Sequence, residues 1–260
     1  MEIQKRLKKL YSFRPTLWNM SLRSLKTKYS GSILGIWWAV ATPCILAISI
    51  NFIFSNVFRM DVQHFTFFVL SGLLPWFFFS NALGETSNCF TGSASILKQC
   101  LFPREIIPLA YVLANFLNFL IGFVVLLPLF IVTKAEVIRF VPFLLLVLFS
   151  QLMFVAGIGI IFSTLNAFVR DVTHFLPTAL MIWFWITPLF YRLEMLDFPY
   201  RWVCLVNPMT YYTVCYQHIL FAAEAPPAFA LLASFFIGIT VLVAGYFFFL
   251  KNERHLLKRI

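Results

Sequence analysis

Charge is scarce in this chain. Only 12% of its 260 residues are charged, whereas hydrophobic residues make up 61% and phenylalanine alone fills 33 positions. A soluble domain is about half apolar and about a quarter charged. The shortage of charge therefore excludes an ordinary soluble enzyme and indicates an integral membrane protein.

The chain also lacks the short motifs of nucleotide and hydrolytic chemistry. It contains no GxxxxGK[ST] phosphate loop, no HExxH and no GxSxG, so we expect no ATP binding through such a loop and no hydrolysis of those types. If ATP drives the protein, a partner has to bind it.

Cysteines are few and show no ligand pattern. The five form no CxxC pair and no cluster with histidine at metal-ligand spacing, so we expect no metal. Cys204 and Cys215 both fall on the outer side of the membrane in the topology predicted below, where a disulfide between them is conceivable. Unpaired thiols are the preferred interpretation.

What the chain has in abundance is long apolar runs. These runs are apolar on every face, which favours membrane-spanning helices over barrel strands, whose residues alternate. We predict an all-α integral membrane protein with six spans: residues 33–58, 65–83, 108–132, 141–168, 175–190 and 228–250. The fifth is short and is expected to break at Pro188 or to draw on flanking residues. No span holds an ionisable group near its middle, which disfavours ion-coupled transport.

Basic residues gather on one side of this predicted topology. Fifteen of the 20 lysines and arginines fall on the side of the two termini, so the positive-inside rule predicts that both termini are cytoplasmic. The net charge of +10 then reflects topology and contact with lipid head groups, and we expect no nucleic-acid partner.

The N-terminal arm, residues 1–32, carries an apolar stripe on a basic background. Residues 16–30 therefore read either as a helix lying in the membrane interface or as a plain basic anchor. Pro15 suits the first turn of this helix and Gly31 suits its end. The stripe consists of Trp18, Leu22, Leu25 and Tyr29.

Two connections and the C-terminal tail complete the organisation. Residues 191–227 are too aromatic for a free loop and too proline-rich for a span, so we predict short re-entrant helices there, one beginning at Pro208. We predict a short cytoplasmic helix within residues 93–105. Pro103 ends this helix, and Arg104 and Glu105 fall in the first turn of the helix that follows. Residues 251–260 are a predicted cytoplasmic tail.

Aromatic rings are the remaining signal. Most of them suit lipid contact and the interfacial belts. Trp183 and Trp185, however, lie in the interior of a predicted span, and the C–H faces of sugars stack on such rings, so a passage for carbohydrate is an open alternative.

Six separated motifs together resemble the permease subunit of polysaccharide exporters in the type-2 ABC transporter family. The resemblance runs in order over essentially the whole chain. The motifs are KYSGSILGIWWAVATP (28–43), GLLPWFFFSNAL (72–83), ILKQCLFPREIIPL (96–109), STLNAFVRDV (163–172), ITPLFY (186–191) and NPMTYY (207–212).

The resemblance implies a homodimer that binds two copies of an ABC ATPase, which holds the ATP and Mg, and exports lipid-linked O-antigen, capsule or teichoic acid across the bacterial inner membrane. It implies that the following residues form the helix coupling the permease to the ATPase: Ile96, Leu97, Lys98, Cys100, Leu101, Phe102, Arg104 and Glu105. The candidates for lining the channel are Trp37, Trp38, Trp76, Phe77, Trp183, Trp185, Tyr191 and Tyr212.

Within that family the sequence favours O-antigen on a polyprenyl diphosphate, with Arg170 and Asp171 as part of a structural motif. Arg23, Lys26 and Lys28 are candidate contacts for the anionic head group, beside their ordinary topological role. Teichoic-acid export, capsule export, export of a small molecule or lipid, and a membrane-embedded polyprenyl-phosphate sugar transferase remain alternatives.

Overall fold

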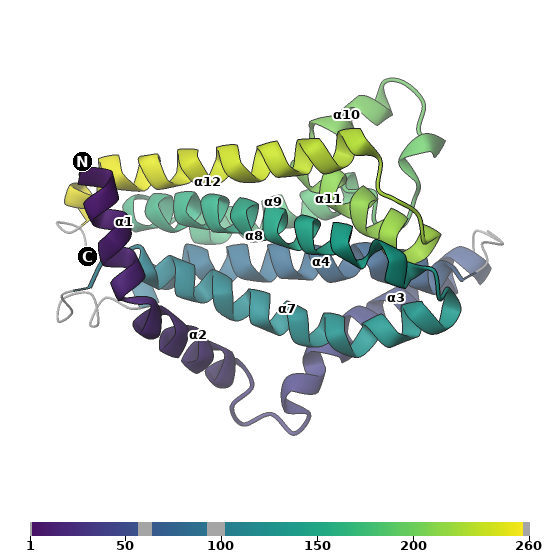
Figure 1. Ribbon diagram of the computed structural model, residues 1–260, viewed down its shortest axis with the longest axis horizontal. Coiled ribbons are helices and arrows are strands. Elements are labelled where there is room, and N and C mark those ends of the chain that lie inside the picture. The colour runs from purple at the N-terminus through teal and green to yellow at the C-terminus, as the bar shows by residue number, and fades with distance from the viewer. Residues whose placement is uncertain (1, 57–63, 93–101, 257–260) are drawn as a thin grey trace.

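A computed structural model describes residues 2–56, 64–92 and 102–256. Every regular element within these ranges is a helix, which confirms the all-α class. Five of the helices are long and apolar enough to cross a membrane, and they run alongside one another as a bundle (Figure 1). They are Gly35–Asn56 (η1, Gly35–Trp37, continued by α3, Trp38–Asn56), α4 (Phe65–Ser87), α7 (Ile106–Thr133), α8 (Val137–Phe168) and α12 (Ala228–Leu256).

The predicted fifth span forms a shorter helix, α9, which covers Val172–Ile186. Its 15 residues reach about 22 Å at 1.5 Å each, less than the hydrocarbon core of about 30 Å. Thr187 takes an extended conformation because a residue before proline is pushed out of the helical region. The described chain thus has five helices of spanning length and one short apolar helix where six spans were predicted.

Helices α4 and α8 form the centre of the bundle. Within their apolar stretches, 72% and 61% of the residues are buried, against 11% in α3, 28% in α7 and 22% in α12. The three peripheral helices therefore keep wide apolar faces that the described part of the chain does not cover.

Helices α8 and α12 approach so closely that their backbones touch. A Cβ atom added to Gly245 would lie 2.3 Å from the carbonyl oxygen of Gly157, and one added to Gly157 would lie 2.4 Å from the carbonyl oxygen of Val241. No side chain fits at such separations, so glycine is required at both positions. Small residues commonly allow this close packing between membrane helices.

The predicted re-entrant region folds as short helices at one end of the bundle. They are η2 (Leu193–Met195), α10 (Tyr200–Val206), α11 (Pro208–Tyr216) and a π-helix, η3 (Gln217–Ala222). Asn207 caps α11 by accepting a hydrogen bond from the backbone of Met209 at 2.9 Å, so the predicted start at Pro208 is confirmed.

A buried glutamine attaches α11 to the core. The Gln151 amide nitrogen donates to the Pro75 carbonyl at 2.9 Å, and its oxygen accepts from the Tyr216 hydroxyl at 2.9 Å. Helices α4, α8 and α11 therefore share one polar contact inside an apolar core. One face of α11 and η3 is fully buried, because the following residues are 0% exposed: Met209, Tyr212, Tyr216 and Ile219.

The N-terminal arm contains two helices, α1 (Glu2–Ser12) and α2 (Arg14–Lys28), where one was predicted. Pro15 lies in the first turn of α2, as predicted. After α2 ends, the chain turns at Gly31, whose φ is +80°, a conformation that glycine adopts readily. Helix α12 continues to Leu256, into the predicted tail; the cytoplasmic position of that tail stays a prediction. The start of α1 and the end of α12 lie at the same end of the bundle, opposite α10 and α11 (Figure 1); we call these two ends of the bundle the terminal end and the far end.

Candidate functional site

An ionic cluster joins three elements at the terminal end. Arg6 of α1 donates to both carboxylate oxygens of Glu105, at 2.8 and 3.0 Å, and its Nη2 also lies 2.7 Å from a carboxylate oxygen of Glu253. Arg104 approaches Glu253 at 3.3 Å. These four residues, the terminal cluster, tie α1 to the start of α7 and the end of α12.

The burial of Glu105 requires a cation beside it. The Glu105 side chain is 0% exposed, and a buried carboxylate is strongly disfavoured unless a partner compensates its charge. The two-pronged guanidinium contact is the geometry that best supplies this compensation. Hydrogen bonds to Glu105 in turn raise the pKa of Arg6 above its ordinary value, so Arg6 stays charged.

Part of the predicted coupling helix lies outside the described residues, namely Ile96, Leu97, Lys98, Cys100 and Leu101. Of the remaining members, Phe102 packs against a small apolar cluster that includes Cys89 and Phe249. Glu105 is enclosed by Arg6, and the assignment of its segment to ATPase coupling stays a prediction. Glu105 anchors the segment to the bundle, because its carboxylate has no surface to offer a partner.

A second polar group links α2 to α4 and α7. The Lys28 ammonium lies 2.8 Å from the Glu85 carboxylate and donates to Asn115 at 2.9 Å, while Asn115 donates to Glu85 at 2.7 Å. Next to this group the Tyr29 hydroxyl donates to Asn118, and burial raises the pKa of Tyr29. The sequence does not reveal these contacts, because the partners come from different helices.

A cavity of about 700 Å³ opens beside α2, and its lining includes Arg23, Lys28, Glu85, Phe102 and Tyr111. We call it the α2 cavity. The charge of Lys28 is already compensated by Glu85, whereas Arg23 makes no ion pair with any residue that the structure describes.

The three candidate head-group residues therefore differ in what they can offer. Arg23 lines the α2 cavity with an uncompensated charge, and Lys28 lines it with a compensated one. Lys26 is exposed outside the lining. Of the three, Arg23 is the best placed to meet an anion in this cavity.

The candidate channel rings fall into two groups. Trp76 and Tyr212 are 4% and 0% exposed, and Trp183 is held by a hydrogen bond to Asn207. Phe77 and Tyr191 are partly buried against the same core. In one chain these rings pack the interior, and the exposed candidates are Trp37, Trp38 and Trp185.

The turn between α8 and α9 is held by amide side chains. Asn166 donates to Asn88 at 3.1 Å, and Thr173 donates to Asn88 and to Asn166, both at 2.9 Å. Arg170 and Asp171 are exposed on this turn, so the polar contacts that fix it come from neighbours that sequence reasoning did not single out.

The described residues contain no group of three or more histidine, cysteine or acidic side chains that could hold a metal ion. Cys204 and Cys215 are free thiols, so the conceivable disulfide between them is absent. Cys204 instead donates to the Ile186 carbonyl at 3.3 Å.

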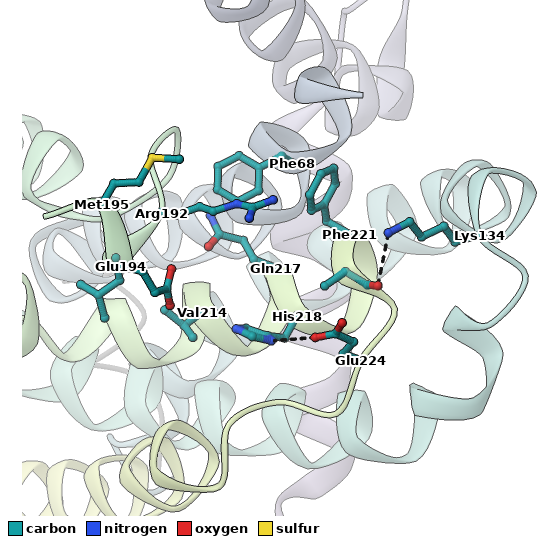
Figure 2. Close-up of a pocket in the computed structure, with 12 residues that line it drawn as sticks. Phe68, Lys134, Arg192, Glu194, Met195, Val214, Gln217, His218, Phe221 and Glu224 are labelled. Carbon is teal, nitrogen blue, oxygen red and sulfur yellow. Dashed lines mark hydrogen bonds and ion pairs between the residues drawn. The ribbon is translucent and has the colours of Figure 1, made fainter. Parts of the chain in front are cut away.

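A second cavity, of about 640 Å³, lies at the far end between η2, η3 and the end of α7. Figure 2 shows charged side chains from three segments around it. Lys134 and Arg192 lie 5.4 and 6.0 Å from the centre of the Phe221 ring, and His218 lies 4.0 Å from Glu224. We call this the far cavity.

Comparison of the sequence with known proteins assigns the chain to a family. Residues 15–221 match the model of the ABC-2 type transporter family. The chain belongs to the ABC-2 type transporter family. The chain is 31% identical to an O-antigen export system permease protein RfbA of Klebsiella pneumoniae over 88% of each chain. It is 29% identical to the protein of the same name in Myxococcus xanthus over 92% of this chain and 93% of that one.

A more distant relative comes from capsule transport. The chain is 26% identical to the polysialic acid transport protein KpsM of Escherichia coli over 73% of this chain and 75% of that one. Membership of the ABC-2 family decides between two of the classes left open by the sequence: the protein is a membrane transport subunit, not a sugar transferase. The family also implies an ABC ATPase as partner.

Proposed function

We propose that this ABC-2 permease exports a lipid-linked polysaccharide, O-antigen on a polyprenyl diphosphate, across the inner membrane of a bacterium. The observation that carries the proposal is similarity to O-antigen export permeases along nearly the whole chain. The α2 cavity supports the proposal, because Arg23 offers a free positive charge where a diphosphate head group would enter.

The proposed assembly is a homodimer with two ATPase subunits, which bind ATP and Mg; this chain needs no cofactor of its own. The wide apolar faces of α3, α7 and α12 leave surface for a second copy and for lipid. We propose six membrane passages, with the short α9 as the fifth and with both termini cytoplasmic, since 15 of the 20 basic residues then face the cytoplasm.

In this mechanism the permease breaks no covalent bond. ATP binding brings the ATPase subunits together, and the movement enters through residues 93–105. The terminal cluster passes it on, because Glu105 at the start of α7 is bound through Arg6 to α1 and to Glu253 of α12. The bundle then opens a passage for a chain too long to be enclosed at once.

Deletion of the gene tests the proposal. We expect lipid-linked O-antigen to accumulate inside the cell and to disappear from the surface, and the intact gene to restore it. The purified permease should hydrolyse no ATP by itself and should co-purify with an ABC ATPase. Normal surface O-antigen after deletion would rule the proposal out.

Capsule export is the second candidate, supported by the weaker similarity to a polysialic acid transport protein. The same deletion separates the two, because loss of capsule with intact O-antigen would favour this candidate.

A further inference from the structure

The far cavity is built by segments that are distant in sequence. Arg192 and Glu194 come from the η2 region, Gln217 and Phe221 from η3, and Lys134 from the end of α7. Its volume of about 640 Å³ falls within the usual range of small-ligand sites, about 300–1,000 Å³.

The polar groups of this cavity keep much of their hydrogen-bonding capacity. Arg192 and Glu194 both line it, yet within the described residues neither side chain forms an ion pair or a hydrogen bond. The Nδ1 atom of His218 is buried and has no hydrogen-bond partner in the described chain, because the Glu224 carboxylate oxygen lies 4.0 Å away, beyond hydrogen-bond distance. Buried polar atoms are normally satisfied, so such an atom beside a cavity points to a missing partner.

The backbone of the same segment has an unusual conformation. Residues Gln217–Ala222 form a π-helix, and Ala223, which ends it, has a left-handed φ of +58°. Single turns of π-helix are rare and occur frequently at functional sites, and a left-handed non-glycine residue is costly unless its surroundings enforce it. This conformation turns Gln217, His218, Phe221 and Ala222 toward one cavity.

The charges of the lining select the ligand. Lys134 and Arg192 are balanced by Glu194 and Glu224, so the cavity does not attract an anion by net charge, and four charged side chains disfavour an apolar tail. Hydroxyl groups both donate and accept, and they match a lining that mixes free donors with free acceptors. The Phe221 ring also lines the cavity, with the Lys134 and Arg192 cations 5.4 and 6.0 Å from its centre.

We infer that the far cavity binds a short stretch of neutral sugar residues of the exported glycan. The inference rests on the proposed function, since it takes the polysaccharide as substrate and the far end as the outer side. A site there holds the emerging end of the chain while the ATPase subunits reset, which hinders slippage backward.

Binding of released glycan to the permease–ATPase complex in lipid nanodiscs tests this inference. The probe is the oligosaccharide freed by mild acid from the lipid-linked glycan of the cell that carries the gene, and binding is followed by saturation-transfer NMR and calorimetry. We expect Arg192→Gln/Glu194→Gln to weaken binding about tenfold or more, because each change removes a charge-assisted hydrogen bond. The matched control is Arg201→Gln/Glu136→Gln, which changes the same residue types at exposed positions outside the lining.

The outcomes separate this inference from the proposed function. Absence of binding by the parent complex, or equal binding by both double variants, overturns the sugar site even if deletion of the gene abolishes export. Displacement of the probe by inorganic diphosphate overturns it in favour of an anion site. Loss of binding in the cavity variant alone, with diphosphate inert, supports it.

Discussion

Glu105 illustrates how one residue acquires a role from its surroundings. In the sequence it belongs to a short polar stretch that the family resemblance assigns to coupling with the ATPase. In the folded chain its side chain is 0% exposed and receives two hydrogen bonds from Arg6. A carboxylate in this position depends on its cation, because the protein interior solvates a lone charge poorly.

Arg6→Gln is therefore expected to destabilise the permease by about 3 kcal/mol, since it leaves a buried carboxylate uncompensated. Adding Glu105→Gln should restore part of the loss, because the second change removes the orphaned charge. Thermal unfolding of the purified protein in detergent measures both. Lys9→Gln, on the exposed side of α1, serves as control. A double variant less stable than Arg6→Gln would show that the pair does not interact as described.

At the scale of elements, the closest contact between helices occurs at glycines, which have no side chain. The α8–α12 pair meets at Gly157 and Gly245, where the backbones leave no space for a Cβ atom. Gly84, by contrast, lies in α4 with no neighbouring atom within 4 Å of an added Cβ. Glycine is therefore required at the α8–α12 contact, whereas at Gly84 of α4 there is space for a side chain.

We expect Gly157→Ala to lower stability by about 2–3 kcal/mol, because overpacking pushes two backbones apart. Gly84→Ala should be neutral or stabilise by up to about 1 kcal/mol, since alanine favours a helix where space permits. Melting temperatures of the two variants in one detergent give the comparison. Equal losses in both would contradict the close approach of α8 and α12.

The link between α7 and α12 carries a second expectation at this scale. Arg104→Glu replaces the cation beside Glu253 with a like charge, so export should fall severely while the protein remains in the membrane. Surface glycan and the amount of permease in membrane fractions are the two measurements. Lys251→Glu, an exposed change on α12, should leave export normal. Normal export by Arg104→Glu would place the transmission of movement elsewhere.

For the whole molecule, the decisive property is the difference between the two ends. The terminal end gathers both chain ends and the ionic cluster, and the far end carries the short helices and the far cavity (Figure 1). Orientation in the membrane then determines which end meets the ATPase and which end meets the exported glycan.

Cysteine labelling measures this orientation. We expect Met195→Cys, at an exposed site of the far end, to react with an impermeant maleimide on intact cells. Lys9→Cys, exposed in α1, should react only after the membrane is permeabilised. The parent chain, whose described cysteines are buried or half-buried, gives the background. The reverse pattern would invert the proposed topology.

The sequence by itself determined the class of the protein, the approximate positions of the long helices and the start of α11. These features depend on local properties, namely run length, proline position and helical spacing, which neighbouring residues express together. The motifs likewise indicated the family, because each is a continuous stretch of chain.

Only the tertiary structure decided which polar residues meet. Arg6 with Glu105 and Glu253, Lys28 with Glu85, and the lining of the far cavity all join residues from different helices. It also assigned Trp76 and Tyr212 to the core and showed that α9 is too short to match the other spans. Such pairings depend on the angle and depth at which helices pack, and those are set by contacts across the whole bundle, which no local pattern of residues encodes.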